Sequence, residues 1–173
     1  MSDKPRKRSR KTTKDNGTRM ETAVESYLQW ALNDLRIQRL RLHGSKDIGD
    51  IGNVYFRGQP VCIEVKWTQT MNAPAHMREA VREAGNADSP YPWVVQKRAG
   101  VGITSIHKLG QQLAYTRTEI LDTMLAISPP QVRAIIKPAE LGRKKDMRLI
   151  TLQDLALILN SGLPLGPDTN KEI

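Results

Sequence analysis

Apolar residues recur every three or four positions between about Arg19 and Arg36, and this spacing predicts an amphipathic helix. The next stretch, 36–44, alternates apolar and basic residues, which is typical of a strand. Two short apolar runs, 50–56 and 61–67, lie on either side of turn-forming residues at 57–60. They predict a second and a third strand joined as a hairpin.

The pattern after this hairpin alternates between helix and strand. It predicts, in order, a helix at 73–86, a strand at 92–98, a mostly helical segment at 105–127, a short strand at 133–138 and a helix at 151–160. The apolar side of the 105–127 segment either completes the core or supplies a dimer contact. The predicted fold class is therefore α/β, in the order helix, three strands, helix and strand, with a helical C-terminal extension.

Length and composition favour one domain. A chain of 173 residues is long enough to bury a single core without disulfides. Cys62 is the only cysteine, which excludes an intrachain disulfide and a multi-cysteine zinc site and is typical of a reducing cytoplasm. No apolar run approaches the roughly 18 residues of a membrane span. We expect a cytoplasmic protein with a basic arm at 1–17, a single domain at 18–161 and a flexible tail at 162–173.

The net charge of +9 is concentrated near the N-terminus, where residues 1–17 carry seven basic and two acidic side chains. Such a run lacks apolar residues, so we expect a disordered arm that is attracted to the phosphates of nucleic acid. The arm residues predicted to contact DNA are Lys7, Arg8, Arg10 and Lys11. A solubilising or targeting tail is the alternative, whereas the absence of an apolar face argues against a membrane surface.

The predicted hairpin places charged side chains where a plain hairpin needs none. Side chains alternate across a strand, so Glu64 and Lys66 share the face opposite to Ile63 and Val65. If the turn centres near residues 57 and 58, Asp50 lies opposite Glu64 to within one or two positions. Two converging carboxylates repel unless a cation lies between them, and oxygen ligands suit Mg²⁺, with Mn²⁺ as a substitute. Lys66 could then orient an attacking water or neutralise a phosphate.

Glu21 lies on the predicted first helix, roughly 60° from the centre of its apolar stripe at 100° per residue. A glutamate that leans towards the sheet needs a partner, and a shared metal site would supply one. The spacing from Thr18 to Glu21 also fits a capping box, in which the glutamate only binds the start of the helix. Spacing alone leaves both interpretations open.

A helical glutamate after Gly17-Thr18, then "HGSKDIGDI" and then "IEVK", occur in an order that resembles the PD-(D/E)xK nuclease superfamily. Within it, the chain is most similar to archaeal-type and phage-encoded Holliday junction resolvases. The resemblance covers about Gly17 to Arg98. It implies a restriction-endonuclease-like core with a mixed central β-sheet flanked by helices, Mg²⁺-dependent cleavage of DNA and a homodimer that acts on branched duplexes.

The resemblance also assigns roles to individual residues. It implies that Asp50, Glu64 and the backbone carbonyl of Val65 bind the metal, and that Lys66 positions the nucleophile. The family's helical glutamate falls on Glu21, with Glu25 as the alternative. The family has a proline before the metal-binding aspartate, and this chain has Gly49 there.

Residues around this motif are further candidates for contacts with DNA. They are Arg39, Arg41, His43, Ser45 and Lys46 before Asp50, and Lys97 in the strand after the second helix, with Gln96 beside it. A solvated basic edge is the alternative. Cys62, His76 and His107 have no metal-ligand partner at useful spacing, so we expect no role for them. The alternatives to a junction-selective nuclease are a nuclease for linear, nicked or flapped duplexes and a non-catalytic basic DNA-binding protein.

Overall fold

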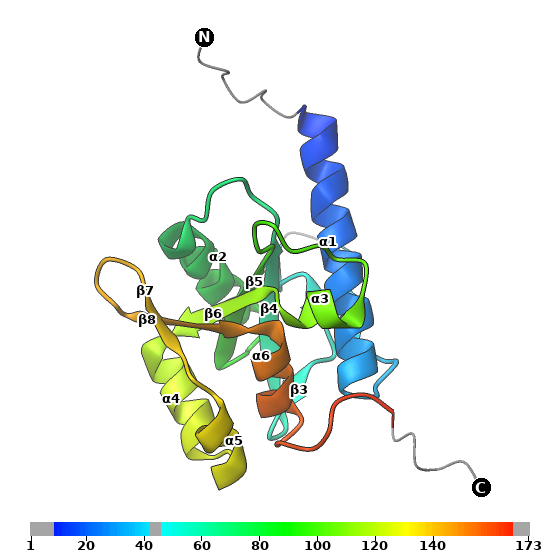
Figure 1. Ribbon diagram of the computed structural model, residues 1–173. Coiled ribbons are helices and arrows are strands. Elements are labelled where there is room, and N and C mark those ends of the chain that lie inside the picture. Colours follow the sequence, from blue (N-terminus) through cyan, green and yellow to red (C-terminus); the bar gives the residue numbers. More distant parts are fainter. Residues whose placement is uncertain (1–8, 42–45, 168–173) are drawn as a thin grey trace, which may run out of the picture.

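The computed structural model describes residues 9–41 and 46–167 (Figure 1). Its helices are α1 (Arg10–Ala31), α2 (Ala73–Asn86), α3 (Ile106–Gly110), α4 (Thr118–Ala126), α5 (Pro130–Ile135) and α6 (Leu152–Leu159). Its strands are β1 (Gln38–Arg39), β2 (Ile51–Gly52), β3 (Tyr55–Phe56), β4 (Gln59–Lys66), β5 (Tyr91–Gln96), β6 (Leu113–Arg117), β7 (Ala139–Leu141) and β8 (Met147–Thr151). Within this described part, no helix is both long and apolar enough to cross a membrane.

The strands form one mixed, open sheet in the order β1-β2-β4-β5-β6-β8-β7, and β3 pairs with β4 beside this path. Only β4 and β5 run parallel; α2 connects them, while every other pairing is antiparallel. The α/β class is confirmed: helices flank a sheet that is mostly antiparallel.

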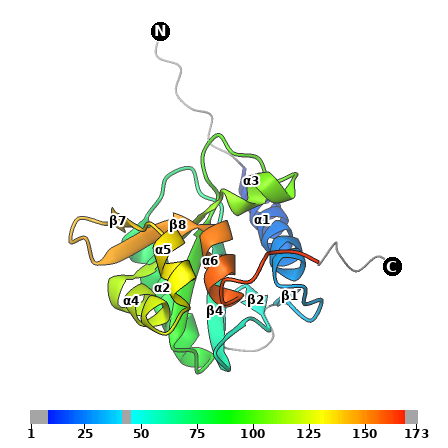
Figure 2. The same cartoon turned by 60° about the horizontal axis from the view of Figure 1, so that its bottom comes forward.

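The two faces of the sheet bury different helices. α1, α3, α4, α5 and α6 contribute to the larger apolar cluster, which also holds Ile63 and Val65 of β4. α2 packs on the opposite face through Met77 and Ala80, against Val94 and Tyr115. Figure 2 shows α1 beside β1 and β2, at one edge of the sheet. Because side chains alternate along β4, Glu64 and Lys66 face α2.

A bulge sets the register of the hairpin. The turn residues Arg57 and Gly58 have φ angles of 50° and 78°, as a tight type I′ turn requires. Ile51 pairs with Ile63 and Tyr55 with Pro60, so the first strand uses four steps where β4 uses three. The extra residue is accommodated near Asn53, which has a φ of 62°. Without it, Asp50 would oppose Val65 instead of Glu64.

The first helix begins earlier and ends earlier than its apolar pattern predicts. Residues 10–17, expected in a disordered arm, are helical, and Ser9 caps the helix by accepting a hydrogen bond from the Thr12 amide at 3.2 Å. Gly17 does not stop the helix, because one interior glycine costs only about 1 kcal/mol. Leu35 lies beyond the helix with 86% of its surface exposed. The capping box at Thr18 is excluded, since Glu21 lies inside α1.

The C-terminal half contains the largest errors of the sequence-based prediction. The segment 105–127 is interrupted by β6, which pairs with β5 and β8. The segment 133–138, predicted as a strand, is the second half of α5 as far as Ile135, followed by three residues in neither helix nor strand. The strands β7 and β8 were not predicted. Short apolar segments of this kind fit both the helical and the strand period. β6 and β8 are strands because they pair with their neighbours in the sheet.

The end of the described chain packs against α1. The amide of Gly166 donates a hydrogen bond to the carbonyl of Ala31 at 3.1 Å, and Leu165 packs against the main core. A Cβ atom on Gly166 would lie 2.7 Å from the Trp30 ring. The chain therefore stays packed against α1 as far as Gly166, beyond the predicted boundary at 161.

Candidate functional site

Asp50 directly precedes β2, and Glu64 lies on the neighbouring antiparallel strand β4, on the face that α2 covers. The Asp50 amide donates to the Ile63 carbonyl at 2.9 Å, next to the Ile51–Ile63 pair, which brings Asp50 near enough to Glu64 for their charges to interact. One carboxylate oxygen of Asp50, Oδ2, accepts a hydrogen bond of 2.7 Å from the amide of Val65. Glu64 is buried, with 5% of its surface exposed. Val65 thus contributes its amide to the site, while its carbonyl remains a predicted ligand.

The two carboxylates are held in a setting that disfavours their charges. Burial, followed by the charge of Glu64, raises the pKa of Asp50 to about 8, although the Val65 amide acts in the opposite direction. Burial and the neighbouring Glu83 carboxyl raise the pKa of Glu64 to about 8, against the effect of Lys66. A divalent cation between these groups would stabilise both as carboxylates.

Lys66 lies two residues after Glu64 on the same face of β4. Its Nζ pairs with Glu64 Oε1 and with Glu79 Oε2, the latter at 2.8 Å. Burial alone would lower the pKa of Lys66, but the hydrogen bonds to the two glutamates raise it above its usual range. Lys66 is therefore a cation at neutral pH and serves as a charge and a hydrogen-bond donor.

α2 adds two glutamates that the sequence analysis did not single out. These are Glu79 and Glu83, which lie one helical turn apart. One carboxylate oxygen from each of them and one from Glu64 lie within 4.8 Å of one another. Glu83 has no exposed surface. The sequence carried a signal for it, because Glu83 falls inside the apolar stripe of the predicted helix at 73–86.

Glu21 does not join this group. Its Oε2 accepts a hydrogen bond of 2.9 Å from Arg39 Nη1, and Glu25 Oε1 accepts one from the Arg39 backbone amide at 2.9 Å. Both helical glutamates therefore bind Arg39, one at its guanidinium and one at its backbone amide, and the DNA contact of Arg39 stays a prediction. Glu21 is near enough for its charge to add to the raised pKa of Asp50.

The glycine before Asp50 has a structural reason. Gly49 has a φ of 95°, a conformation that proline cannot adopt. A Cβ atom there would lie 3.0 Å from Cys62 Sγ and 3.1 Å from the Ile63 carbonyl oxygen. The proline of the resembling family is thus excluded by the way the chain enters β2. The Asp47 carboxylate turns back to accept a hydrogen bond from the Gly49 amide at 3.3 Å, so it does not replace Asp50.

The predicted DNA contacts fall into three groups. Exposed side chains are those of Arg10, Lys11, Arg41 and Lys46. Predictions that lie outside the described residues are those for Lys7, Arg8, His43 and Ser45. Lys97 is partly buried, and its Nζ donates to the Arg98 carbonyl at 2.7 Å and lies 5.4 Å from the centre of the Trp67 ring.

Two polar residues border the Lys66 end of the site. Gln96 is opposite Lys66 in the parallel pairing of β4 and β5, and its amide group donates to Thr68 Oγ1 at 3.0 Å. His76 of α2 is half-buried, and its Nδ1 lies 3.1 Å from the Tyr115 hydroxyl. Burial, with the charge of Lys66, lowers the pKa of His76. His76 is therefore partly enclosed by the fold and lies beside the Lys66 end of the site.

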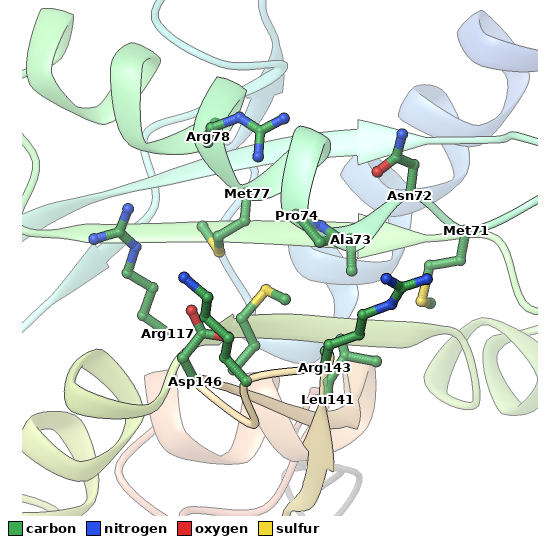
Figure 3. A pocket seen from close by; sticks show the side chains of 13 residues that line it. Met71, Asn72, Ala73, Pro74, Met77, Arg78, Arg117, Leu141, Arg143 and Asp146 are labelled. Atoms are coloured by element: carbon green, nitrogen blue, oxygen red, sulfur yellow. The ribbon is translucent and has the colours of Figure 1, made fainter.

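A separate cavity of about 650 Å³ lies between the start of α2 and the β7–β8 hairpin (Figure 3). Its lining combines methionine and leucine side chains with four basic residues, Arg78, Arg117, Arg143 and Lys144. Asp146 is the acidic residue in this lining. The arginines in Figure 3 come from different elements and surround the hollow, which gives it a basic rim over an apolar floor.

Comparisons of this chain with family models, with curated proteins and with solved structures find no match.

Proposed function

We propose that this protein is a divalent-metal-dependent endonuclease that hydrolyses phosphodiester bonds in DNA. The observation that carries the proposal is the proximity of Asp50, just before β2, to Glu64 and Lys66 of β4: Lys66 pairs with Glu64, and the charges of both act on Asp50. The order of α1, the β2–β4 hairpin, α2 and the parallel strand β5 is that expected of a restriction-endonuclease-like core.

The donor set suits a hard cation. Asp50 and Glu64 offer carboxylate oxygens, and the thiol of Cys62 is a poor competitor because burial raises its pKa to about 12. Oxygen ligands of this kind favour Mg²⁺ or Mn²⁺ over zinc. Burial, above all, raises the pKa values of the two acids, and a bound divalent cation would stabilise their charged forms.

Each residue then has a part in the reaction. A divalent cation, when bound, supplies an activated water and charge neutralisation at the scissile phosphate. Asp50 and Glu64 hold it, with the carbonyl of Val65 as a further oxygen. Lys66, a cation within reach of Glu64, orients the attacking water or stabilises charge on the phosphate.

The exposed basic residues supply the attraction to DNA. Arg10 and Lys11 lie in the first turn of α1. Arg41 and Lys46 precede Asp50 in the sequence, one on each side of residues 42–45. By its resemblance to junction resolvases, we propose branched duplexes as the substrate and a homodimer as the active form. Linear, nicked or flapped duplexes are the alternative substrates, because the site chemistry is the same for each.

A non-catalytic DNA-binding protein is the second candidate function. The observation that favours it is that Lys66 is engaged with Glu64 and Glu79, as in a structural ion-pair network. In that case the acids would only balance Lys66, and divalent cations would not stabilise the fold.

Cleavage of synthetic DNA by Glu64→Ala and Lys66→Ala variants tests the proposal. Wild-type protein should cleave four-way junctions, or one of the matched linear, nicked and flapped duplexes, only when Mg²⁺ or Mn²⁺ is present. Each variant should lose at least about 100-fold in cleavage rate and bind the same DNA with nearly wild-type affinity. Glu140→Gln, which alters an exposed glutamate of β7 at the opposite edge of the sheet, is the control and should cleave normally. Undiminished cleavage by Glu64→Ala would contradict the assignment.

A further inference from the structure

Three carboxylates converge between β4 and α2, and they come from two different elements. Glu64 projects from the middle of β4, while Glu79 and Glu83 project from successive turns of α2 towards the sheet. The three ligand oxygens lie within 4.8 Å of one another, a spacing that one cation can bridge. Asp50 lies beside this group but is not one of the three.

Within this group of three carboxylates, Glu83 is the one without a hydrogen-bond donor among the described residues. Its side chain has no exposed surface, and among the described residues neither of its carboxylate oxygens has a hydrogen-bond partner. The closest guanidinium, that of Arg82, lies 3.8 Å away and is 67% exposed. A buried carboxylate without donors is strongly destabilising unless it binds a cation or carries a proton.

Lys66 satisfies only part of this group. Its Nζ pairs with Glu64 and Glu79 but has no ion pair with Glu83. One ammonium group thus faces at least two carboxylates, and Glu83 is left with the solvent-exposed Arg82 guanidinium at 3.8 Å. A divalent cation next to Glu64 and Glu83 would supply a further positive charge and bind their oxygens directly.

The resemblance to resolvases points to a different helix for the extra ligand. Glu21 of α1 was the expected carboxylate, but its Oε2 is held by Arg39 at 2.9 Å. α1 packs on the Ile63 and Val65 face of β4, whereas Glu64 faces α2. The element that covers the Glu64 side chain is α2, so its glutamates are the ones in position to share a cation with Glu64.

We propose that Glu79 and Glu83 of α2 are metal ligands, and that together with Glu64 they form a cation position next to the one at Asp50. This inference rests on the proposed function for the reaction that the cation would serve. Its test, metal binding without DNA, does not depend on that function. Glu64 then bridges the two positions, and α2 replaces α1 as the source of the extra ligands. The cation is Mg²⁺ or Mn²⁺, since every donor is a carboxylate oxygen.

Manganese binding to the full chain tests this assignment without DNA. Mn²⁺ titrations followed by electron paramagnetic resonance or calorimetry would compare wild type with Glu83→Gln, Glu79→Gln and Glu21→Gln. Glutamine keeps the shape of each side chain and removes its charge. We expect each α2 variant to weaken Mn²⁺ binding by about 10- to 100-fold, and Glu21→Gln, the matched variant in α1, to bind as wild type does.

Wild-type Mn²⁺ affinity in Glu83→Gln and Glu79→Gln would overturn the inference and would show that a shared proton, not a cation, satisfies Glu83. A loss in Glu21→Gln with none in the α2 variants would also overturn it, by returning the ligand to α1. Because Glu79 is partly exposed, Glu79→Gln keeps the test decisive if Glu83→Gln does not fold.

The two proposals can fail separately. If Glu83→Gln weakens Mn²⁺ binding but the wild-type protein cleaves no DNA, the α2 ligands stand and the nuclease assignment falls. If Asp50→Asn loses cleavage while Glu83→Gln and Glu79→Gln keep both cleavage and Mn²⁺ binding, the nuclease stands and the α2 ligands fall.

Discussion

Gly49 controls how Asp50 reaches the site, because its backbone conformation turns the chain into β2. Its φ of 95° lies in the left-handed region, and the Cys62 thiol and the Ile63 carbonyl fill the space beside it. Gly58 in the hairpin turn also has a positive φ, of 78°, but its surroundings are open. Alanine at Gly58 would therefore meet only backbone strain, whereas alanine at Gly49 would meet the same strain and a steric clash.

We expect Gly49→Ala to destabilise the fold more than Gly58→Ala. Each variant carries the strain of a non-glycine residue at positive φ, about 1–3 kcal/mol, and only Gly49→Ala adds a clash. Urea denaturation of the two variants and wild type measures the free energies of unfolding. Equal losses in both variants would show that the contact with Cys62 and Ile63 does not matter.

The raised pKa of Asp50 predicts a pH dependence for the metal-free protein. The pKa is about 8 in the folded protein and 3.8 when the group is unperturbed, so between these values the folded state binds more protons than the unfolded state. This contribution to stability is present below about pH 4 and is lost as the pH rises towards 8. Urea midpoints from pH 5 to 8 in a chelator should therefore fall, and excess Mn²⁺ should flatten the trend.

Asp50→Asn is the control for this pH effect, since the amide does not titrate. The decline in stability should be shallower in this variant than in wild type. Glu64 titrates in the same range and keeps part of the slope, whereas His76, with its lowered pKa, acts in the opposite direction. Identical slopes in the two proteins would show that Asp50 is ionised in the metal-free fold.

At the scale of elements, one inserted residue decides which side chains meet. The bulge near Asn53 shifts the register so that Asp50 comes beside Glu64. The Asn53 side chain stabilises the bulge by donating a hydrogen bond to the Arg36 carbonyl at 2.7 Å. A regular hairpin would move Asp50 by one position and reverse the face of its side chain. The site thus depends on an irregular element as much as on its acids.

The segment 162–167 is an element without helix or strand that supports α1. Leu165 packs against the core, and Gly166 passes closely over Trp30. A chain that ends at residue 161 should unfold at lower urea than one that ends at 167, by about 1–3 kcal/mol for the lost apolar contacts. Chemical denaturation of these two truncated chains makes the comparison, and equal stabilities would restore the predicted boundary at 161.

At the scale of the whole molecule, the basic charge is distributed over more than the N-terminal arm. The cavity beside α2 carries Arg78 and Arg143 on its rim, and Arg78 directly precedes Glu79 in α2. If the DNA of the proposed complex passes along α2, Arg78 and Arg143 would offer further phosphate contacts. Electrostatic contacts of this kind make DNA affinity depend on salt.

We expect the double variant Arg78→Ala and Arg143→Ala to bind DNA more weakly and with less salt dependence. The slope of log affinity against log salt should become shallower by about one for each lost phosphate contact. Fluorescence anisotropy with a labelled duplex at several salt concentrations measures it. Lys137→Ala, an exposed lysine outside the cavity lining, is the control. The same slope in the double variant and wild type would exclude the cavity from the DNA path.

The N-terminal half of the fold was predictable because its patterns are long or bounded by clear turns. The α2 segment was predicted with its observed bounds, and the strands β4 and β5 to within a few residues. β6 and β8 were missed because strands of five residues carry little periodicity. Their conformation comes from pairing in the sheet, which no local pattern encodes.

The sequence by itself determined the α/β class and the shared face of Glu64 and Lys66, since alternation along a strand is a local property. The tertiary structure alone decided which carboxylates join them. Glu79 and Glu83 meet Glu64 because α2 crosses back over the sheet to connect β4 with β5, while Arg39 holds Glu21 beside α1. Such contacts link elements distant in the sequence, so they depend on packing and not on spacing.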